Sequence, residues 1–462
     1  MASPSPLKQL ANLIVASVER IDAACNTQGV SFPSLDEPIS PSSEEIRHQP
    51  DVSQAINVIV AAATQLIATA RVPTISVVTL GLQWAAISSL GVANDTNIPE
   101  ILREAGPQGL HVNEIAKKNG LDPARIGRVL RTLATIHVFK EVKPDVFANN
   151  ALSSVLDTGK PIEALLEDPM GKHDGTSGIP AIVGHTTDEV YRAGTQLSTV
   201  LRDPKWGHSQ EPTEAALNKA FNTPLPPFEW LELPENAYRL RRFGVGMDGT
   251  SKIFPAGAVL QVADVAGGIG SVSMIIAKAY PHLKIFVEDR EQVVPEAKKF
   301  WDSSLPDALS SGRVSLVPID MFAAQPAVGQ NADLYILRQI LHDWSDKYAA
   351  KILTQLRAAA GSKSKLLVIE SILSYACEQP ADELTISGAQ AKVVAPAPLL
   401  PNFGGAGAPS YFGDLLMLAI QNGQERTLLH FSNLLKSTGW ELKEVRRPPT
   451  GIGHSYLVSM PV

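Results

Sequence analysis

Residues 262–289 read VADVAGGIGSVSMIIAKAYPHLKIFVED, and this segment predicts a strand, a glycine-rich turn, a helix and a second strand. The turn is AGGIG at 266–270, and the helix after it should end before Pro281, because a proline ring clashes with the preceding helical turn. The second strand is short and apolar and closes with an acid, Asp289. A βαβ unit of this kind is typical of a Rossmann-like α/β sheet.

The glycine-rich turn indicates a site for a ligand that contains a nucleoside. Glycine has no Cβ, so the backbone can approach a ligand closely, and an acid at the end of the second strand is placed to bind ribose hydroxyls. A dinucleotide site would need a third glycine, in the pattern G-x-G-x-x-G, where this chain has Ser273. A nucleoside is therefore favoured over a dinucleotide, and a turn that binds nothing is the remaining alternative. The residues of this candidate site are Asp264, Gly267, Gly268, Gly270 and Asp289.

Length and composition predict a soluble protein of two domains with additional segments. The chain has 462 residues, of which 44% are hydrophobic and 19% charged, and its net charge of −7 argues against a general nucleic-acid binder. Cys25 and Cys377 are too few for a disulfide framework and lack metal-ligand spacing, which predicts a reducing, cytoplasmic location. Glu19 and Arg20 do not suit a signal peptide, and the longest apolar run, 58–70, is interrupted by polar residues, so we expect no membrane span.

Periodicity and composition divide the chain into four expected parts. They are a helix (7–24) and a Pro/Ser-rich linker over 1–50, a winged-helix domain over 51–160, a helical connecting segment over 161–255, and a Rossmann-like domain over 256–462 with a Pro/Gly/Ala-rich insertion at 378–410. In the second part, helices are expected at 52–70 and 73–90. The latter is apolar nearly all round and should be buried, in its own domain or by another subunit.

A winged helix-turn-helix is predicted from helices at 98–104, 113–119 and 124–136 and short strands at 139–142 and 146–149. Asp122 and Pro123 give the third helix a clear start, since aspartate caps a helix and proline suits its first position. One function of this motif is DNA binding, which would place in the groove Arg125, Arg128 and Arg131. Because the chain is acidic and carries a second, enzyme-like domain, a dimerisation module is favoured.

The last part is expected to contain a mixed sheet on a Rossmann-like core, which gives the chain its α/β class. Five strands separated by helices precede a C-terminal antiparallel hairpin. The strands are expected at 260–265, 284–287, 314–318, 334–337 and 366–370, and those of the hairpin at 440–445 and 455–459.

His342 is the strongest candidate for chemistry. It follows the strand at 334–337, and because ligands of open α/β sheets lie at the carboxyl ends of strands, it should lie beside the glycine-rich turn. Glu370 ends the next strand, and Glu425 starts the helix after residues 422–423. An imidazole flanked by two carboxylates is a neutral base held in one tautomer, with its charged form stabilised. For the removal of a proton near neutral pH we expect a base with a pKa of about 6.5. A lone histidine at a strand end is more often structural, so the catalytic interpretation depends on the two acids.

Asp320 and Met321 follow a further strand and are candidates for binding a purine, the acid through a hydrogen bond and the thioether through contact with the ring. The alternative roles are a helix cap and a core side chain. No cluster of acids has convincing metal-ligand spacing, and we expect no metal.

The order of motifs resembles that of the plant caffeate and flavonoid-type (class II) O-methyltransferases and their fungal natural-product relatives, which transfer methyl from S-adenosyl-L-methionine without a metal. The resemblance covers the chain from about residue 55 onward. Its motifs are DVAGGIG (264–270), VEDR (287–290), IDMF (319–322), LRQILHDWSD (337–346), VIESIL (368–373), GDLLML (413–418) and NGQERT (422–427). HDWSD and NGQERT together are the specific part.

The resemblance implies roles by position. The implied cofactor residues are Asp264, Gly267, Gly268 and Gly270 in the loop, Asp289 at the ribose, Asp320 and Met321 at the adenine, and Arg338, usually lysine in plant members, near the carboxylate. The implied catalytic residues are the general base His342 with Glu370 and Glu425 beside it. The residues implied near the acceptor are Phe243, Met247, Asp343, Asp414 and Met417, with 161–255 as a substrate wall.

Two departures from the family pattern are Ala266, where glycine is usual, and Arg290-Glu291 after the ribose acid, where Leu-Pro is common. A Cβ at 266 strains the loop if that position needs a positive φ. We expect a homodimeric S-adenosylmethionine-dependent O-methyltransferase that acts on a hydroxyl of an aromatic small molecule. The alternatives are a winged-helix regulator that binds DNA and senses a nucleoside metabolite, and a nicotinamide-dependent reductase.

Overall fold

A computed structural model describes residues 4–253, 262–377, 383, 385–391, 393, 395–448 and 453–462, without the side chains of 248–253 and 391. The chain forms two compact units. The first contains Met1–Thr195, Pro227–Ile253 and Ala397–Leu399, and the second contains Gln196–Pro226, Phe254–Pro396 and Leu400–Val462. The segment expected as one connecting piece, 161–255, is therefore divided between the units. The insertion expected at 378–410 lies partly outside the described residues.

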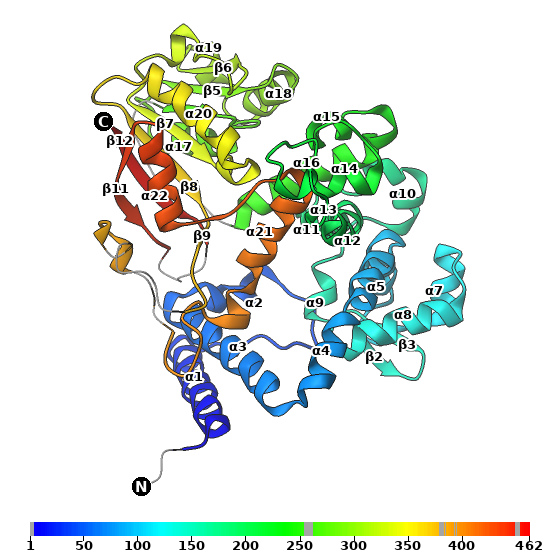
Figure 1. Cartoon of the computed structure of the whole chain (residues 1–462). Helices are drawn as coiled ribbons and strands as arrows, with labels where there is room; N and C mark the ends of the chain where they lie inside the picture. The colour runs from blue at the N-terminus through cyan, green and yellow to red at the C-terminus, as the bar shows by residue number, and fades with distance from the viewer. Residues whose placement is uncertain are drawn as a thin grey trace. The chain divides into compact units, whose positions relative to one another are not determined.

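The first unit begins with two long helices that pack side by side, α1 (Pro6–Gln28) and α3 (Pro50–Ala70) (Figure 1). The side chain of Ser5 caps α1 by accepting a hydrogen bond from the backbone N–H of Lys8. The prediction of a linker up to residue 50 is wrong for part of that segment, because residues 41–48 form α2 (Pro41–Glu44) and the 3-10 helix η1 (Glu45–His48). Ile46 of η1 is buried in a cluster with α1 and α3, and this contact orders the segment.

The apolar helix expected at 73–90 forms two helices, α4 (Pro73–Gly81) and α5 (Trp84–Asp95). The prediction that this segment is buried within its own chain is wrong, because many of its apolar side chains are exposed. The exposed apolar residues, which we call the α4 face, are Ile75, Val77, Val78, Leu80, Leu82 and Trp84. By length and composition, Pro50–Ala70 and Pro73–Asp95 are also apolar enough to cross a membrane, contrary to the expectation for 58–70, although helices of soluble proteins meet the same criterion.

A small antiparallel sheet lies beside the three helices predicted for the winged motif. The elements are α6 (Ile98–Ala105), β1 (Leu110–His111), α7 (Val112–Asn119), α8 (Pro123–Thr135), β2 (Lys140–Lys143) and β3 (Val146–Ala148), with strand order β1-β3-β2. Asp122 caps α8 by accepting a hydrogen bond from the N–H of Arg125 at 2.9 Å. Arg131, a groove residue in the DNA-binding alternative, is paired with Glu141 and Asp145.

The remaining helices of the first unit include α16 (Ala237–Ile253), which packs along α11 (Ile179–His185). Arg242 of α16 is buried and binds Asp188 and Glu189 at 3.0 and 2.6 Å, so charge pairs hold α16 to the segment after α11. The others are α9 (Ala151–Ser154), α10 (Ile162–Glu167), η2 (Pro169–Gly171), the π-helix η3 (Thr186–Val190), α12 (Tyr191–Thr195), α15 (Pro227–Leu231) and η5 (Pro234–Asn236).

The second unit is built on a seven-stranded mixed sheet, as the sequence predicts (Figure 1). The strands are β4 (Val262–Val265), β5 (Ile285–Asp289), β6 (Val314–Pro318), β7 (Leu334–Arg338), β8 (Lys365–Glu370), β11 (Trp440–Arg446) and β12 (Ser455–Pro461). Their order is β11-β12-β8-β7-β4-β5-β6, with β4 to β8 parallel and the C-terminal hairpin antiparallel. Positions 260–261 of the first expected strand lie outside the described residues. A separate parallel pair joins β9 (Ile372–Leu373) to β10 (Arg426–Thr427).

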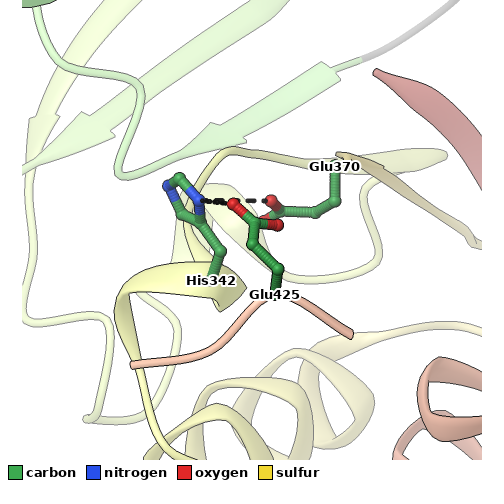
Figure 2. Close-up of side chains that lie close together, drawn as sticks. All are labelled: His342, Glu370 and Glu425. Carbon is green, nitrogen blue, oxygen red and sulfur yellow. Dashed lines mark hydrogen bonds and ion pairs between the residues drawn. The ribbon is translucent and has the colours of Figure 1, made fainter. Parts of the chain in front are cut away.

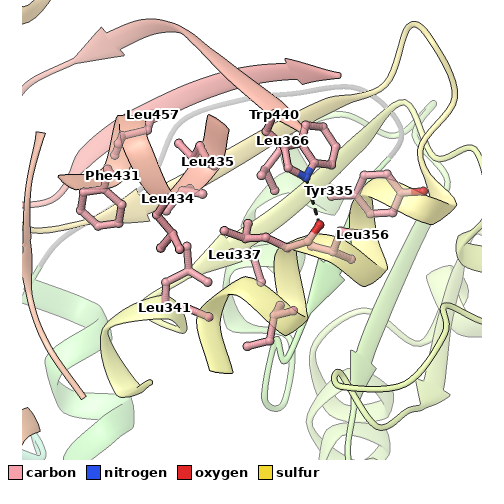
Figure 3. Close-up of a cluster of buried hydrophobic side chains, with 14 of the residues drawn as sticks. Tyr335, Leu337, Leu341, Leu356, Leu366, Phe431, Leu434, Leu435, Trp440 and Leu457 are labelled. Carbon is pink, nitrogen blue, oxygen red and sulfur yellow. Dashed lines mark hydrogen bonds between the residues drawn. The ribbon is translucent and has the colours of Figure 1, made fainter. Parts of the chain in front are cut away.

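Side chains alternate along the strands, so each face of the sheet has its own core. Tyr335 of β7 lies in the cluster with α20 (Asp346–Ala359) and α22 (Leu428–Ser437), where Trp440 donates a hydrogen bond to the carbonyl of Leu353 (Figure 3). Its neighbour Ile336 lies in the cluster of the other face, with α17 (Ser271–Ala279), α18 (Val294–Ser304) and α19 (Pro306–Ser310). The other helices are α13 (Leu197–Leu201), η4 (Trp206–His208), α14 (Ala216–Phe221), η6 (Ala327–Gly329), η7 (Leu341–Asp343), η9 (Ala389–Ala391), η10 (Gly404–Ala406) and α21 (Ala408–Gln421).

Candidate active site

The glycine-rich loop at 266–270 joins the carboxyl end of β4 to the first turn of α17. Gly268 and Gly270 have φ values of +60° and +83°, a region that glycine adopts without strain. Gly267 packs closely against the side chain of Asp264. A Cβ at position 267 would lie 2.7 Å from the carboxyl carbon of Asp264, so a larger residue would not fit there. Ala266 has a φ of +55°, so the strain considered for this position is present.

Asp264 supports the loop from within the fold. Its side chain is buried and accepts a hydrogen bond from Oγ of Ser273 at 2.7 Å. Burial raises the pKa of Asp264 to about 6, although the Ser273 hydrogen bond opposes the shift. Ser273 stands where a dinucleotide loop would have its third glycine, so the residue that departs from that pattern has a structural role of its own.

Asp289 ends β5 beside the same loop. Its Oδ2 accepts a hydrogen bond from the backbone N–H of Gly268 at 2.7 Å, and burial raises its pKa. A Cβ at Gly268 would meet nothing within 4 Å, so the loop surface next to the acid is open. A half-buried acid beside an open glycine surface fits the ribose role that the sequence suggested.

Arg338 ends β7 as a half-buried cation, and its guanidinium forms no hydrogen bond or ion pair with any residue in the described part of the chain. Burial lowers its pKa, while the nearby carboxylate of Asp264 opposes that shift. Asp320 and Met321 come two and three residues after β6 rather than at its end. Asp320 accepts a hydrogen bond from the N–H of Phe322 at 2.9 Å within a turn, so the helix-cap alternative for Asp320 is wrong. Met321 packs half-buried against the core, as the alternative role for it expected.

His342 lies in η7, the turn after β7, and Nδ1 of its ring faces two glutamates (Figure 2). Nδ1 is 2.8 Å from Oε1 of Glu425 and 4.0 Å from Oε2 of Glu370. The side chains of His342, Glu425 and Glu370 are 13%, 8% and 0% exposed. The structure therefore brings together the three predicted residues. The expectation that Glu425 starts a helix is wrong, because Glu425 precedes β10 and α22 begins only at Leu428.

The two glutamates hold His342 in different ways. Glu370 uses Oε1 to accept hydrogen bonds from the backbone N–H groups of Ile340 and Leu341, at 3.0 and 2.9 Å. It therefore fixes the turn that carries the imidazole. Glu425 binds the imidazole ring itself. This hydrogen bond occupies Nδ1 and leaves Nε2 as the nitrogen for another partner.

The acids around His342 change its affinity for a proton. Burial lowers the pKa of the imidazole, but the carboxylates of Glu370, Asp343 and Glu425 outweigh burial and raise it to about 10. Asp343 is close on the other side of the ring, with Oδ1 3.6 Å from Nε2. Burial in turn raises the pKa of Glu370 to about 7 and that of Asp343 to about 6. The pKa of about 6.5 expected for the base is therefore wrong for the protein alone, in which His342 holds its proton at neutral pH.

His342, Glu370 and Glu425 offer ligand atoms that lie within 4.8 Å of one another, a spacing that a metal ion also accepts. Their hydrogen bonds favour a different use. Glu425 bonds directly to the ring nitrogen, and Glu370 is bonded to two backbone N–H groups. This arrangement orients an imidazole and stabilises its charged form.

Two residues of the site escaped the sequence reasoning. Arg426, within NGQERT, is fully buried and donates a hydrogen bond to the carbonyl of Leu341 at 2.7 Å. An arginine next to an assigned acid was the available signal. Burial, together with the charges of Arg338 and His342, lowers the pKa of His454 to about 4, so this histidine also belongs to the surroundings of the site. No sequence pattern singled it out.

The residues predicted near the acceptor pocket fall in both units. Those in the second unit are Asp343, Asp414 and Met417, and those in the first are Phe243 and Met247. Asp414 of α21 accepts a hydrogen bond from the N–H of Glu425 at 2.9 Å, so it helps to hold a catalytic candidate. In the first unit the ring of Phe243 packs edge-on against His185, with centroids 5.3 Å apart.

The second unit thus has a Rossmann-like sheet with a glycine loop and a histidine at its carboxyl edge, and comparisons with known proteins identify the family. Residues 252–441 match the model of the O-methyltransferase domain, and residues 82–159 match that of the O-methyltransferase dimerisation domain. The chain belongs to the plant-type (class II) O-methyltransferase family, in its fungal branch.

Relatives of known class match nearly the whole length of this chain. An O-methyltransferase of Armillaria gallica is 48% identical over 96% of both chains. The 4-O-methyltransferase 1 of Phanerochaete chrysosporium is 39% identical over 97% of both chains. The solved mitomycin 7-O-methyltransferase MmcR, 25% identical, covers 85% of this chain and 99% of its own with a TM-score of 0.62. The protein is an S-adenosylmethionine-dependent O-methyltransferase of a small molecule.

Ala266→Gly should stabilise the second unit, because glycine relieves a left-handed conformation that costs an L-residue about 1 kcal/mol. We expect a higher midpoint of thermal unfolding and tighter binding of S-adenosylhomocysteine in calorimetric titration. Ala358→Gly, at an exposed position inside α20, is the control and should lower the midpoint. A lower midpoint for both variants would show that the loop needs the methyl group of Ala266.

Proposed function

We propose that the enzyme methylates a hydroxyl of an aromatic small molecule of phenolic or polyketide type, with His342 as general base and without a metal, as a cytoplasmic homodimer. The observation that carries the proposal is the 2.8 Å hydrogen bond between Nδ1 of His342 and Glu425. It fixes one orientation of the ring and leaves Nε2 for the acceptor hydroxyl.

The charges around the ring suit this chemistry. A phenol with a pKa of about 10 is largely protonated at neutral pH, so a base must remove its proton as the oxygen attacks. His342 does so in its neutral form, and the surrounding acids then stabilise the imidazolium that results. When bound, S-adenosylmethionine supplies a methyl group that is already electrophilic, so alignment supplies much of the remaining rate.

The glycine loop and its neighbours fit this cofactor. Asp289 beside the open surface of Gly268 suits a ribose diol, and the half-buried guanidinium of Arg338 suits a carboxylate. Asp320 and Met321 are assigned to the adenine. The name of the relative 4-O-methyltransferase 1 denotes methylation of an oxygen at a numbered position, which supports a hydroxyl as the acceptor group.

His342→Gln should lower kcat by about 10²- to 10⁴-fold, the usual contribution of a general base. The affinity for S-adenosylhomocysteine should stay unchanged, since the side chain is not assigned to the cofactor. His282→Gln replaces an exposed histidine of the same unit and serves as control. Equal loss of cofactor binding and turnover in His342→Gln would make His342 structural.

The turnover of the wild-type enzyme measured with EDTA should equal the turnover measured without it, because the proposed mechanism uses no metal. Loss of activity with EDTA would contradict that mechanism.

Glu425→Gln should move the pH profile of kcat/KM to lower pH. A raised pKa means that His342 keeps its proton until the pH approaches about 10, so wild-type kcat/KM should rise steadily from pH 7 to pH 9. Removing one carboxylate lowers that pKa and makes the neutral base available earlier. The acceptor is the same in both assays, so its own ionisation cancels. Identical profiles would mean that Glu425 does not set the proton affinity of His342.

Leu80→Glu should convert a dimer into a monomer in analytical ultracentrifugation, because it places a charge on the α4 face, where Leu80 is 71% exposed. The matched dimerisation domain begins at residue 82, inside this face. Val328→Glu, at an exposed apolar position in η6, is the control and should leave the mass unchanged. A dimer that survives the change at Leu80 would place the interface elsewhere.

A further inference from the structure

Two carbonyl groups of the turn that carries His342 accept hydrogen bonds from one buried side chain. Arg426 is 0% exposed, and its guanidinium donates from Nη1 to the carbonyl of Leu341 and from Nη2 to that of Trp344, both at 2.7 Å. These carbonyls lie immediately before and two residues after His342. The guanidinium therefore spans the turn and restrains both of its ends.

The loop that supplies Arg426 also touches the turn directly. The backbone N–H of Gln424 donates to the carbonyl of His342 at 2.9 Å. A Cβ at Gly423 would lie 2.4 Å from that carbonyl oxygen and 2.7 Å from the carbonyl of Asp343. Only a glycine at 423 lets the backbone of this loop come so close to the turn, so the contact between loop and turn depends on that residue.

The two sides of the turn face opposite charges. Its N–H groups at Ile340 and Leu341 donate to the carboxylate of Glu370, and its carbonyls at Leu341 and Trp344 accept from Arg426. Hydrogen bonds to charged groups are about twice as strong as neutral ones. The carboxyl group of Glu370 on one side and the guanidinium of Arg426 on the other thus hold the backbone of His342 at a fixed position.

Arg426 is itself fixed from outside. Its Nε donates to Oδ1 of Asp346 at 3.0 Å, and the same oxygen accepts from Nε2 of Gln424 at 2.8 Å. The other carboxylate oxygen of Asp346 is 2.7 Å from Nε2 of His430. A planar guanidinium with five donors can serve two carbonyls and a carboxylate together, which a lysine ammonium at the same place cannot do in that geometry.

We propose that Arg426 is a positioning residue for methyl transfer, which holds the turn so that Nε2 of His342 meets the acceptor hydroxyl in one alignment. This inference rests on the proposed role of His342 as the base. Arg426 makes no contact with the ring; it acts through the backbone of the turn.

Arg426→Lys in the full-length enzyme tests the role, because lysine keeps the charge and much of the volume. We expect kcat to fall by about 10- to 100-fold, the cost of a misplaced catalytic group. The Kd of S-adenosylhomocysteine should stay within about twofold, and the pH at which kcat/KM bends should not move. Arg357→Lys is the matched control, since Arg357 also donates to two carbonyls, of Gly439 and Val462, in the same unit. It should keep wild-type kcat.

Asp346→Asn gives a second test that does not depend on changing a buried residue. It weakens the outer support of Arg426 and should lower kcat less than Arg426→Lys does, with cofactor binding unchanged. Wild-type kcat in Arg426→Lys, alongside an inactive His342→Gln, would overturn the positioning role alone. Parallel loss of cofactor affinity, thermal stability and kcat in Arg426→Lys would also overturn it. Full activity of His342→Gln would instead overturn the proposed function.

Discussion

The parallel pairing of β4, β7 and β8 is the constraint on which the site depends. Its register sets Asp264 beside Ile336 and Arg338 beside Ile369, so the three strands end at one edge of the sheet. The glycine loop, the histidine turn and Glu370 all leave the sheet there. A slip of one residue would turn each strand's side chains to the opposite face and separate these partners. The hydrogen bonds of the site refine an arrangement that the backbone ladder imposes.

That arrangement gathers several carboxylates around a single imidazole, which is costly because burial disfavours each negative charge. The chain offsets the cost with backbone N–H groups at Glu370 and with the protonated ring of His342. The proton on His342 therefore contributes to the balance of charge as well as to the chemistry. A site of this kind is built around the charged form of its base.

Much of this was accessible from the sequence. The apolar runs gave the seven strands, and the rule that parallel strands present ligands at their carboxyl ends was enough to group His342 with Glu370. Periodicity shows that a helix such as α4 is apolar but not which surface covers it, so its exposure was missed. Arg426 was missed because its role depends on the backbone carbonyls of Leu341 and Trp344, and a sequence does not show which carbonyls a side chain will reach. The pKa of His342 was misjudged because it reflects three acids at once, each at a distance that only the fold determines.

The bond between Ser273 and Asp264 has a consequence for the choice of cofactor. The hydroxyl of Ser273 is the side-chain donor to a carboxylate that lies wholly inside the protein. A glycine at that position, as in a dinucleotide loop, would remove this hydroxyl donor and leave the backbone hydrogen bond of residue 273 and the nearby charge of Arg338 to favour the ionised form of Asp264. A change of the loop toward the dinucleotide pattern would therefore weaken the support of a buried acid as well as alter the loop itself. The serine that departs from that pattern is tied to the fold beneath the loop, through its hydrogen bond to Asp264.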